Sequence, residues 1–434
     1  MVFSYEDRND DTFYGLYRIS WLVVTALGIV GVAYLVMNSG ISIDVAFLQV
    51  LINNFSSIML ILSALVGAAL VVGWIQVALA SKLGEELVLL VTWVTPFAVI
   101  GVSLFLFNAN NDINYLGGTV AGLLFLGFVF YFRKSLRLSA RLIEVGAEVT
   151  THHPSLFLPQ LTSVVATTVL TILMVPGVIV VAIFSLPIHP ILTWFLEVIY
   201  MFLYTFAIAA FQAFADASNI SFVDYWYSKS GKPGLSKAAG HVKSRRAPIV
   251  RFAFLTAFIS RFRRDNGGGF TPFRLFELMK FSNWKKVLFR GRSILGTAAR
   301  TAQYFGSYTL VVLMVKNMNS VAQAYKESAK TVFERFVENI AGSMGFNILE
   351  SFRQVFSALL MLIAGGAYGY LSYGQDIVMA IVFAFLFLFL GYYPLNAMFK
   401  PAINAYRVIL YRAHTGKISS KLDSKTKEII KAVI

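Results

Sequence analysis

The sequence predicts an all-α protein, a polytopic transmembrane helical bundle of 8–10 spans with amphipathic helices at the membrane interface. Of its 434 residues, 57% are hydrophobic and only 14% are charged, and the mean hydropathy is +0.69. Soluble domains usually carry about 25% charged residues and lack apolar runs of roughly 20 residues, the length a helix needs to cross a bilayer. The absence of cysteine excludes a disulfide framework, thiol catalysis and a cysteine-ligated metal.

Residues 1–216 are predicted to form an N-terminal bundle of six spans. The second and third spans are joined by a predicted turn at 81–86 that contains Lys82. No secretory signal peptide is expected, because the N-terminus is acidic and the first apolar run is long enough to remain as a span. The six predicted spans are 19–37, 55–80, 87–107, 114–132, 157–187 and 190–212.

The rest of the chain divides by pattern into three further domains. They are a basic, aromatic-rich segment, a two-span hairpin and a basic cytoplasmic tail, at 217–351, 352–398 and 399–434. The basic segment contains two apolar stretches of about 14–15 residues, 247–260 and 302–316, which are short for a full crossing. It also contains a predicted amphipathic helix at 327–342, and the segment after the fourth span has the same character.

The distribution of Lys and Arg predicts the orientation, because short cytoplasmic loops are enriched in these residues. The connections 38–54 and 108–113 contain none, whereas the segment after the fourth span and the C-terminal tail are basic. Both termini of this multi-pass protein are therefore predicted to lie on the cytoplasmic side of the cell membrane. This parity requires that both short apolar stretches cross, giving ten spans with 261–300 outside, or that neither does, giving eight.

Positive charge is concentrated in residues 243–300, which hold 14 Lys or Arg against Asp265 and Glu277 in a chain of formal charge +15. Interleaved basic and aromatic residues are typical of segments that contact phosphates and stack on unpaired bases. The same composition describes a helix at an anionic bilayer surface, and residue chemistry favours the lipid without excluding nucleic acid. The predicted contact residues for either ligand are Arg261, Arg263, Arg264, Arg274, Lys285, Lys286, Arg290 and Arg292.

Catalytic motifs are absent from the sequence, which contains no G-x-x-x-x-G-K-[ST], H-E-x-x-H or G-x-S-x-G pattern. The triple glycine at 267–269 has no Lys-Ser/Thr after it and is interpreted as a hinge. His152 and His153 have no nearby carboxylate pair, and a solvated helix cap is the expected role. The sequence therefore predicts no enzyme, no cofactor and no metal.

An alternative prediction is a small-molecule or lipid transporter. Coupled carriers bury ionisable residues within their spans, and Glu197 is the one clear candidate here. Pro96 and Pro176 lie within predicted spans, where kinked helices line cavities in some membrane proteins. The ordinary roles of these residues are a helix–helix hydrogen bond for the glutamate and packing for the prolines. The transporter hypothesis places a pocket near Glu197 and a pathway along all three residues.

Length, span density, lack of cysteine and a strongly basic region without an energy-coupling site resemble the polytopic membrane subunit of the crenarchaeal DNA-exchange (Ced) import system. The C-terminal part, from "YKESAKTVFERFVENIAGSMGF" into "LNAMFKPAINAYRVILYRAHTGK", is also similar to uncharacterised archaeal and bacterial polytopic membrane proteins. The first resemblance implies a channel or scaffold component of a DNA-translocating complex, passive itself and powered by a separate ATPase. It implies membrane lipids, small membrane subunits, that ATPase and DNA as partners, and no residue role is carried over.

Overall fold

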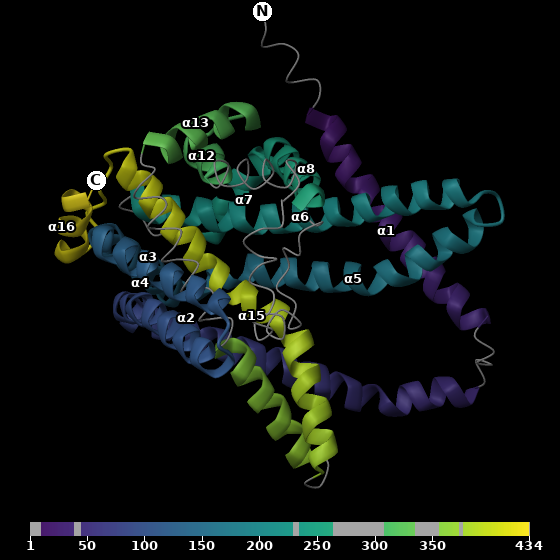
Figure 1. Cartoon of the computed structure of the whole chain (residues 1–434). Helices are drawn as coiled ribbons and strands as arrows, with labels where there is room; N and C mark the ends of the chain where they lie inside the picture. Colours follow the sequence, from purple (N-terminus) through teal and green to yellow (C-terminus); the bar gives the residue numbers. More distant parts are fainter. Residues whose placement is uncertain are drawn as a thin grey trace, which may run out of the picture. The chain divides into compact units, whose positions relative to one another are not determined.

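The structure is a computed structural model of the full chain and describes residues 10–38, 45–228, 234–263, 308–334, 356–372 and 376–433. Every regular element in these residues is a helix, so the predicted all-α fold class is confirmed (Figure 1). Five helical segments are long and apolar enough to cross a membrane, and the protein is a membrane protein. They are Thr12–Leu35, Ala64–Asn110, Ile113–Tyr131, Pro154–Ser185 and Pro190–Ser228, with shorter apolar helices at Phe356–Ser372 and Ile377–Leu388.

Helix α2 (Val45–Asn110) is one continuous helix of 66 residues, and the turn predicted at 81–86 is wrong. At 1.5 Å per residue it is about 99 Å long, more than three times the thickness of a bilayer core. The polar residues at 81–86 stay helical because they are mostly good helix formers and because the buried Glu85 pairs with cations on neighbouring helices. Two apolar stretches therefore share one helix with a charged band between them.

The number of crossings stays a prediction. The two short apolar stretches of the basic segment correspond to α8 (Arg246–Arg263) and, in part, to α12 (Thr309–Val315), and neither is among the candidate spans of the described residues. The seven residues of α12 extend only about 10 Å. Five long and two shorter candidates make seven crossings if each crosses once. A cytoplasmic location of both termini requires an even number and so also stays a prediction.

The chain forms two compact units, each assembled from separate stretches of sequence. The first unit comprises Met1–Ala64, Pro159–Ser221 and Ser236–Ala329, and the second comprises Leu65–Leu158, Phe222–Leu235 and Lys330–Ile434. The units interleave along the sequence because α2, α5 (Phe157–Ser185) and α6 (Pro190–Ser228) each begin in one unit and end in the other. The four domains predicted from the sequence pattern are not tested by this division and stay a prediction.

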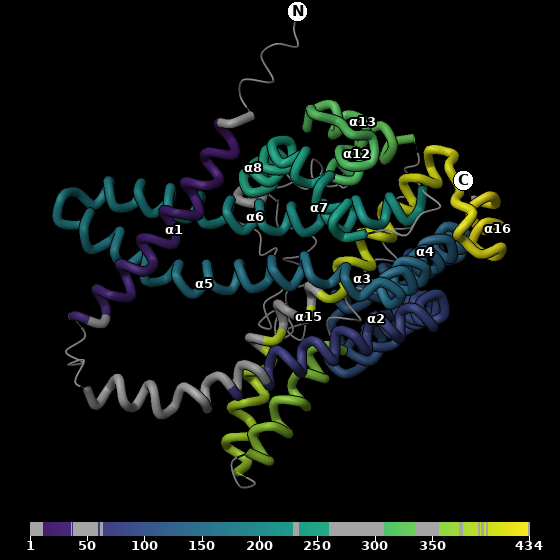
Figure 2. Tube along the Cα trace, turned by 180° about the vertical axis from the view of Figure 1, so that it is seen from behind, coloured from purple at the N-terminus to yellow at the C-terminus, as the bar shows by residue number. Residues whose placement is uncertain are grey.

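In the first unit, α5 and α6 run antiparallel and side by side, and α1 (Asp10–Asn38) crosses them (Figures 1 and 2). Their shared core consists of Val24, Leu170, Tyr200, Tyr204 and Ala207. Glycine allows the close approach of α1 and α5, because a Cβ added at Gly28 would lie 2.5 Å from the Cβ of Leu173. Apolar side chains and small residues thus hold these helices together.

The remaining helices of the first unit are short. Helix α7 (Leu235–Ser244) leads into α8, which packs on α1 and contacts α12. All seven residues of α12 are buried. Helix α13 (Val321–Glu334) buries Val321, Ala324, Ser328 and Val332 along one face, so the predicted amphipathic helix is confirmed for its described part, up to Glu334.

In the second unit, α3 (Leu116–Tyr131), α4 (Arg133–His152) and α2 lie side by side, and α15 (Ile377–His414) packs along α4 (Figures 1 and 2). The predicted amphipathic character of the segment after the fourth span is confirmed, because α4 buries one side against α15 and against α16 (Ser424–Val433). A Cβ at Gly146 of α4 would lie 2.6 Å from the carbonyl oxygen of Ala402. The two backbones are therefore in close contact there.

Helix Phe356–Ser372 and α15 lie where the two-span hairpin is predicted, but their apolar parts are shorter than the candidate spans, and a double crossing here stays a prediction. Glycines allow these two helices to approach closely, because an added Cβ at Gly365 and at Gly369 would lie 2.9 Å from the Cα atoms of Ala384 and Ala380, respectively. Gln76 of α2 donates a hydrogen bond of 2.6 Å to Ser357 Oγ, which connects this hairpin to α2. Asp376 caps α15 by accepting from the backbone N–H of Val378.

Candidate functional site

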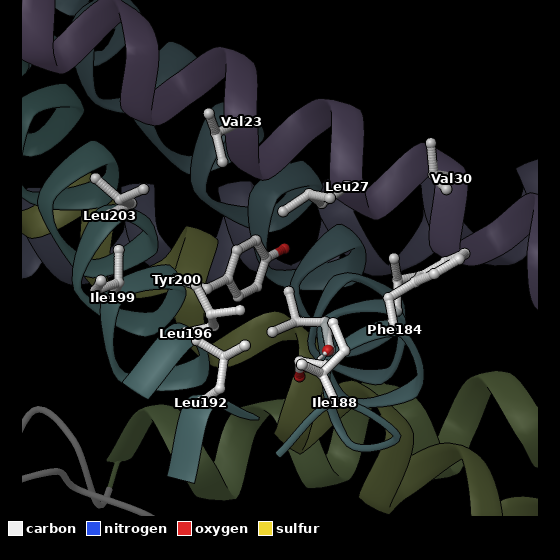
Figure 3. Close-up of a pocket in the computed structure, with 13 residues that line it drawn as sticks. Val23, Leu27, Val30, Phe184, Ile188, Leu192, Leu196, Ile199, Tyr200 and Leu203 are labelled. Carbon is white, nitrogen blue, oxygen red and sulfur yellow. Dashed lines mark hydrogen bonds between the residues drawn. The ribbon is translucent and has the colours of Figure 1, made fainter. Parts of the chain in front are cut away.

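The first unit contains an apolar cavity of about 540 Å³ between α1, α5 and α6 (Figure 3). Pockets that hold small ligands usually measure about 300–1,000 Å³, so the volume suits a lipid chain or a small apolar molecule. Regular helical spacing brings the lining residues to the same place, three from α1 and five from α6. These are Val23, Leu27 and Val30 of α1, and Leu192, Leu196, Ile199, Tyr200 and Leu203 of α6.

The cavity has a few polar groups, and each is already bonded. The Tyr200 hydroxyl lies against Gly177 and 3.5 Å from the carbonyl oxygen of Val24, to which it donates. Ser185, on the α5 side, donates to Thr193 Oγ1 at 2.9 Å. Among the described residues, no carboxylate or cation lines this cavity. Its chemistry suits the binding of an apolar group.

None of the three predicted pathway residues lines this cavity. Glu197 is half-buried on α6, between the lining residues Leu196 and Tyr200. Pro176 of α5 lies against α1, where a side chain at Gly31 would collide with it. Pro96 belongs to the second unit, and its carbonyl oxygen lies 3.1 Å from where Gly122 of α3 would carry a Cβ. The prolines thus occupy close helix contacts, and the pathway role stays a prediction.

The second unit contains a cluster of ion pairs that the sequence did not reveal. Glu85 of α2 has a side chain only 7% exposed, and its two carboxylate oxygens contact Arg137 Nε at 2.8 Å and Lys425 Nζ at 2.7 Å. The backbone N–H of Glu85 donates to the carboxylate of Glu144 at 2.8 Å. One buried carboxylate therefore connects α2 with α4 and with the C-terminal helix α16.

Arg141, one turn after Arg137 on α4, extends the same cluster. Its guanidinium pairs with Glu144, lies 3.0 Å from Asp423, and donates to Thr426 Oγ1 at 3.0 Å. Burial raises the pKa of Asp423, but its hydrogen bonds to Thr426 and the charge of Arg141 outweigh that effect and leave the pKa below its ordinary value. We call Glu85, Arg137, Arg141, Glu144 and Asp423, with Lys425 and Thr426, the α16 clasp.

A second set of bonds joins the end of α6 to the last turn of α15 and to the segment after it, within the same unit. Arg412 contacts Asp224 at 2.6 Å, the Tyr227 hydroxyl donates to the carbonyl of Lys417 at 2.8 Å, and Ser419 Oγ donates to the carbonyl of Tyr227 at 2.7 Å. Basic residues of α4 and of the tail, from which the orientation is predicted, thus also form ion pairs that join helices within this unit. One sequence signal could have indicated the clasp. Arg137 and Arg141 are four residues apart, so they lie on the same face of helix α4 and can pair with the same neighbouring helices.

The predicted DNA- or lipid-contact residues mostly lie outside the described residues. Arg261 and Arg263 fall on the last turn of α8, where only the backbone is described. The other six, Arg264, Arg274, Lys285, Lys286, Arg290 and Arg292, are not described. We call residues 243–300 the basic stretch. Its described beginning carries Lys243 and Arg246, and both side chains are exposed. The structure therefore neither assembles nor separates the predicted contact set.

The predicted helix-cap histidines lie at the C-terminal end of α4. The exposed His152 bonds through Nδ1 to the carbonyl of Glu148 at 2.8 Å, and the His153 ring packs on Phe222 with centroids 5.3 Å apart. Burial, and then the charges of His152 and Lys421, lower the pKa of His153, so it is neutral at physiological pH. The pair caps and packs its helix.

In comparisons with known proteins, no protein-family model matches this chain and no curated protein is significantly similar to it.

Proposed function

We propose that this protein is a channel or scaffold subunit of a DNA-translocating complex in the cell membrane, passive itself and powered by a separate ATPase. The observation that carries the proposal is the net charge of residues 243–300, where 14 cationic residues stand against two acids. A segment with this charge attracts a polyanion, and its interleaved aromatic residues suit stacking on unpaired bases. The likeness to the Ced membrane subunit supports the same function.

Two further features agree with a passive role. No nucleotide-binding motif occurs in the sequence, so the free energy for translocation has to come from another protein. The most apolar stretch of each candidate span contains at most two Asp, Glu, Lys or Arg residues, whereas proton- or cation-driven carriers place titratable groups at depth. Lipids, small membrane subunits and that ATPase are the partners of this proposal.

The proposal is tested by DNA binding to the full-length protein in nanodiscs of phosphatidylcholine, which carries no net charge. We expect a fluorescent single-stranded oligonucleotide to bind, with an affinity that falls steeply as salt rises. Changing Arg261, Arg263, Arg264, Lys285 and Lys286 to Glu is expected to abolish this binding. Since each phosphate contact contributes roughly 0.7–0.9 to the salt slope, any residual binding should have a slope lower by about 4.

The matched control changes five exposed lysines elsewhere to Glu, which alters the net charge by the same amount. Suitable positions are Lys82, Lys134, Lys237, Lys417 and Lys431. If the two five-residue variants bind DNA equally well, the attraction is a property of net charge alone, and the proposed role of the basic stretch is wrong.

The apolar cavity favours a second candidate function, a small-molecule or lipid transporter. Its volume of about 540 Å³ and aliphatic lining suit an acyl chain, and Glu197 lies beside it on α6. The corresponding assay is transbilayer movement of an NBD-labelled phospholipid in proteoliposomes. Under this hypothesis Leu196→Trp, which fills the cavity, slows movement, and Glu197→Gln reduces it and alters its pH dependence. Native rates in both variants would remove the transporter from consideration.

A further inference from the structure

Two arginines from different helices of the first unit share one aromatic ring. The guanidinium carbon of Arg18, on α1, lies 4.7 Å from the ring centroid of Tyr14, and that of Arg246, at the start of α8, lies 4.9 Å from the same centroid. Both distances are within the range of a cation–π contact. Two positive charges are thus held close together at the contact between α1 and α8.

Neither charge is neutralised within the described part of the chain. Arg18 and Arg246 are both exposed, and no described carboxylate forms an ion pair with either. The neighbouring Arg245, in contrast, donates a hydrogen bond to the side chain of Asn319. Arg251, which is half-buried, adds a third cation over the ring of Phe13 at 5.7 Å. Mutual repulsion of these charges is lowered when an anion binds between them.

The position of the pair on α1 points to the membrane surface. The candidate span begins at Thr12, so Tyr14, Tyr17 and Arg18 lie within its first two turns. Tyrosine is enriched at the level of lipid headgroups, and long cationic side chains near a span end extend toward that level. A phosphate of a lipid headgroup is the anion available at this depth, and the planar fork of arginine matches its oxygens.

We propose that Arg18 and Arg246, aligned by Tyr14, form a binding site for the phosphate of an anionic membrane lipid. The bound headgroup joins the first span to the α7–α8 segment and fixes where the basic stretch leaves the membrane. Arg246 belongs to the basic stretch 243–300, but neither arginine of this site is among the eight predicted contact residues, the first of which is Arg261. It holds whether the protein translocates DNA or transports a lipid.

The test is binding of dioctanoyl phosphatidylglycerol to the full-length protein in a neutral detergent, followed by thermal unfolding. We expect the unfolding midpoint to rise with phosphatidylglycerol and not with dioctanoyl phosphatidylcholine or with inorganic phosphate at the same concentration. Arg18→Gln with Arg246→Gln should weaken phosphatidylglycerol binding by roughly tenfold or more. The matched control, Lys237→Gln with Lys243→Gln, removes two exposed cations of α7 that contact no described ring and should bind as the native protein does.

Three other outcomes would contradict the proposal. Equal losses in the two double variants would reduce the effect to general charge, and no rise in the native protein would exclude the site. A rise caused by a short oligonucleotide and absent with phosphatidylglycerol would assign the arginines to DNA. If the glutamine pair does not fold, Arg18→Lys with Arg246→Lys keeps both charges and should still lose affinity because it lacks the planar fork.

One more variant addresses the nearest acids in the sequence, Asp10 and Asp11. If these carboxylates already neutralise the two arginines, the native protein will not respond to phosphatidylglycerol and Asp10→Asn with Asp11→Asn will. That pattern would overturn the proposal. A response of similar size in both proteins supports it.

Discussion

The apolar cavity of the first unit and the α16 clasp of the second are both contacts between three helices, yet they are held together differently. Around the cavity, aliphatic faces and glycines bring α1, α5 and α6 together and leave about 540 Å³ between them. In the clasp, a carboxylate that is only 7% exposed contacts cations from two helices, while Gly146 brings α4 into backbone contact with α15. The first arrangement has room for a ligand, and the second fixes helices in place.

The largest difference is expected at the glycine contact of the second unit. Gly146→Val would place a side chain against Ala402 and should lower the free energy of unfolding by about 2–3 kcal/mol. Gly101→Val on α2 is the matched control, because a Cβ at Gly101 meets nothing within 4 Å. Thermal unfolding in detergent measures both variants. Equal effects would show that α4 and α15 are not closely packed in solution.

The next effect concerns the charge at the centre of the clasp. Glu85→Gln leaves Arg137 and Lys425 without their shared carboxylate and should cost about 1–2 kcal/mol. The value is below that of a fully buried pair because these two cations are about half exposed. Glu86→Gln, next to it and exposed, should change the unfolding midpoint little. Equal unfolding midpoints in the two variants would show that the clasp does not contribute to stability.

A smaller effect follows from the lowered pKa of Asp423. A depressed carboxyl pKa stabilises the folded state above the unfolded value, about 3.9, and this stabilisation is lost as pH falls through the lower folded-state value. The docking of α16 should therefore weaken in acid, below about pH 4. Anisotropy of a fluorophore on Lys431→Cys, unique in a chain without cysteine, reports this release. Asp423→Asn should reduce the pH-dependent step and leave the part contributed by Glu85, which pairs with Lys425 of α16. An unchanged step would exclude Asp423 as a source.

The smallest effect is expected inside the cavity. Val23→Phe enlarges a lining residue into empty space and should change the free energy of unfolding by no more than about 0.5 kcal/mol. Val24→Phe, one position along α1, enlarges a residue that is fully buried in the core and should cost about 1–3 kcal/mol. Equal destabilisation by both changes would mean that the cavity is filled or collapsed in solution.

Apolar runs predicted most of the long helices correctly, since burying 20 consecutive apolar residues leaves few alternatives to a membrane helix. Amphipathic spacing predicted α4 and the described part of α13 for a similar reason. The continuity of α2 was not predictable from pattern, because Lys82, Glu85 and Glu86 are as typical of a loop as of a helix whose charges are paired. What decided it are the partners Arg137 and Lys425, which are distant in sequence.

The candidate sites were less predictable than the helices. The cavity is lined by the same Val, Leu and Ile that fill any core, so no residue type marks it. The clasp joins Arg141 to Thr426 across 285 positions, a separation that a single sequence does not encode locally. The predicted pocket near Glu197 is close to the observed cavity, because neighbours of Glu197 on α6 line that cavity. The glutamate itself does not line it. Charge concentration, in contrast, is a property of composition and is visible without a structure.

The proposed contact of the basic stretch with DNA during translocation is tested most directly by DNA uptake in cells of the native host. Cells carrying the protein with Arg261, Arg263, Arg264, Lys285 and Lys286 changed to Glu are compared with cells carrying the five-lysine control. We expect the first variant to insert into the membrane at native levels. Cells that carry it should take up no DNA, whereas cells that carry the control should take up DNA normally. Native uptake by the first variant would contradict the claim.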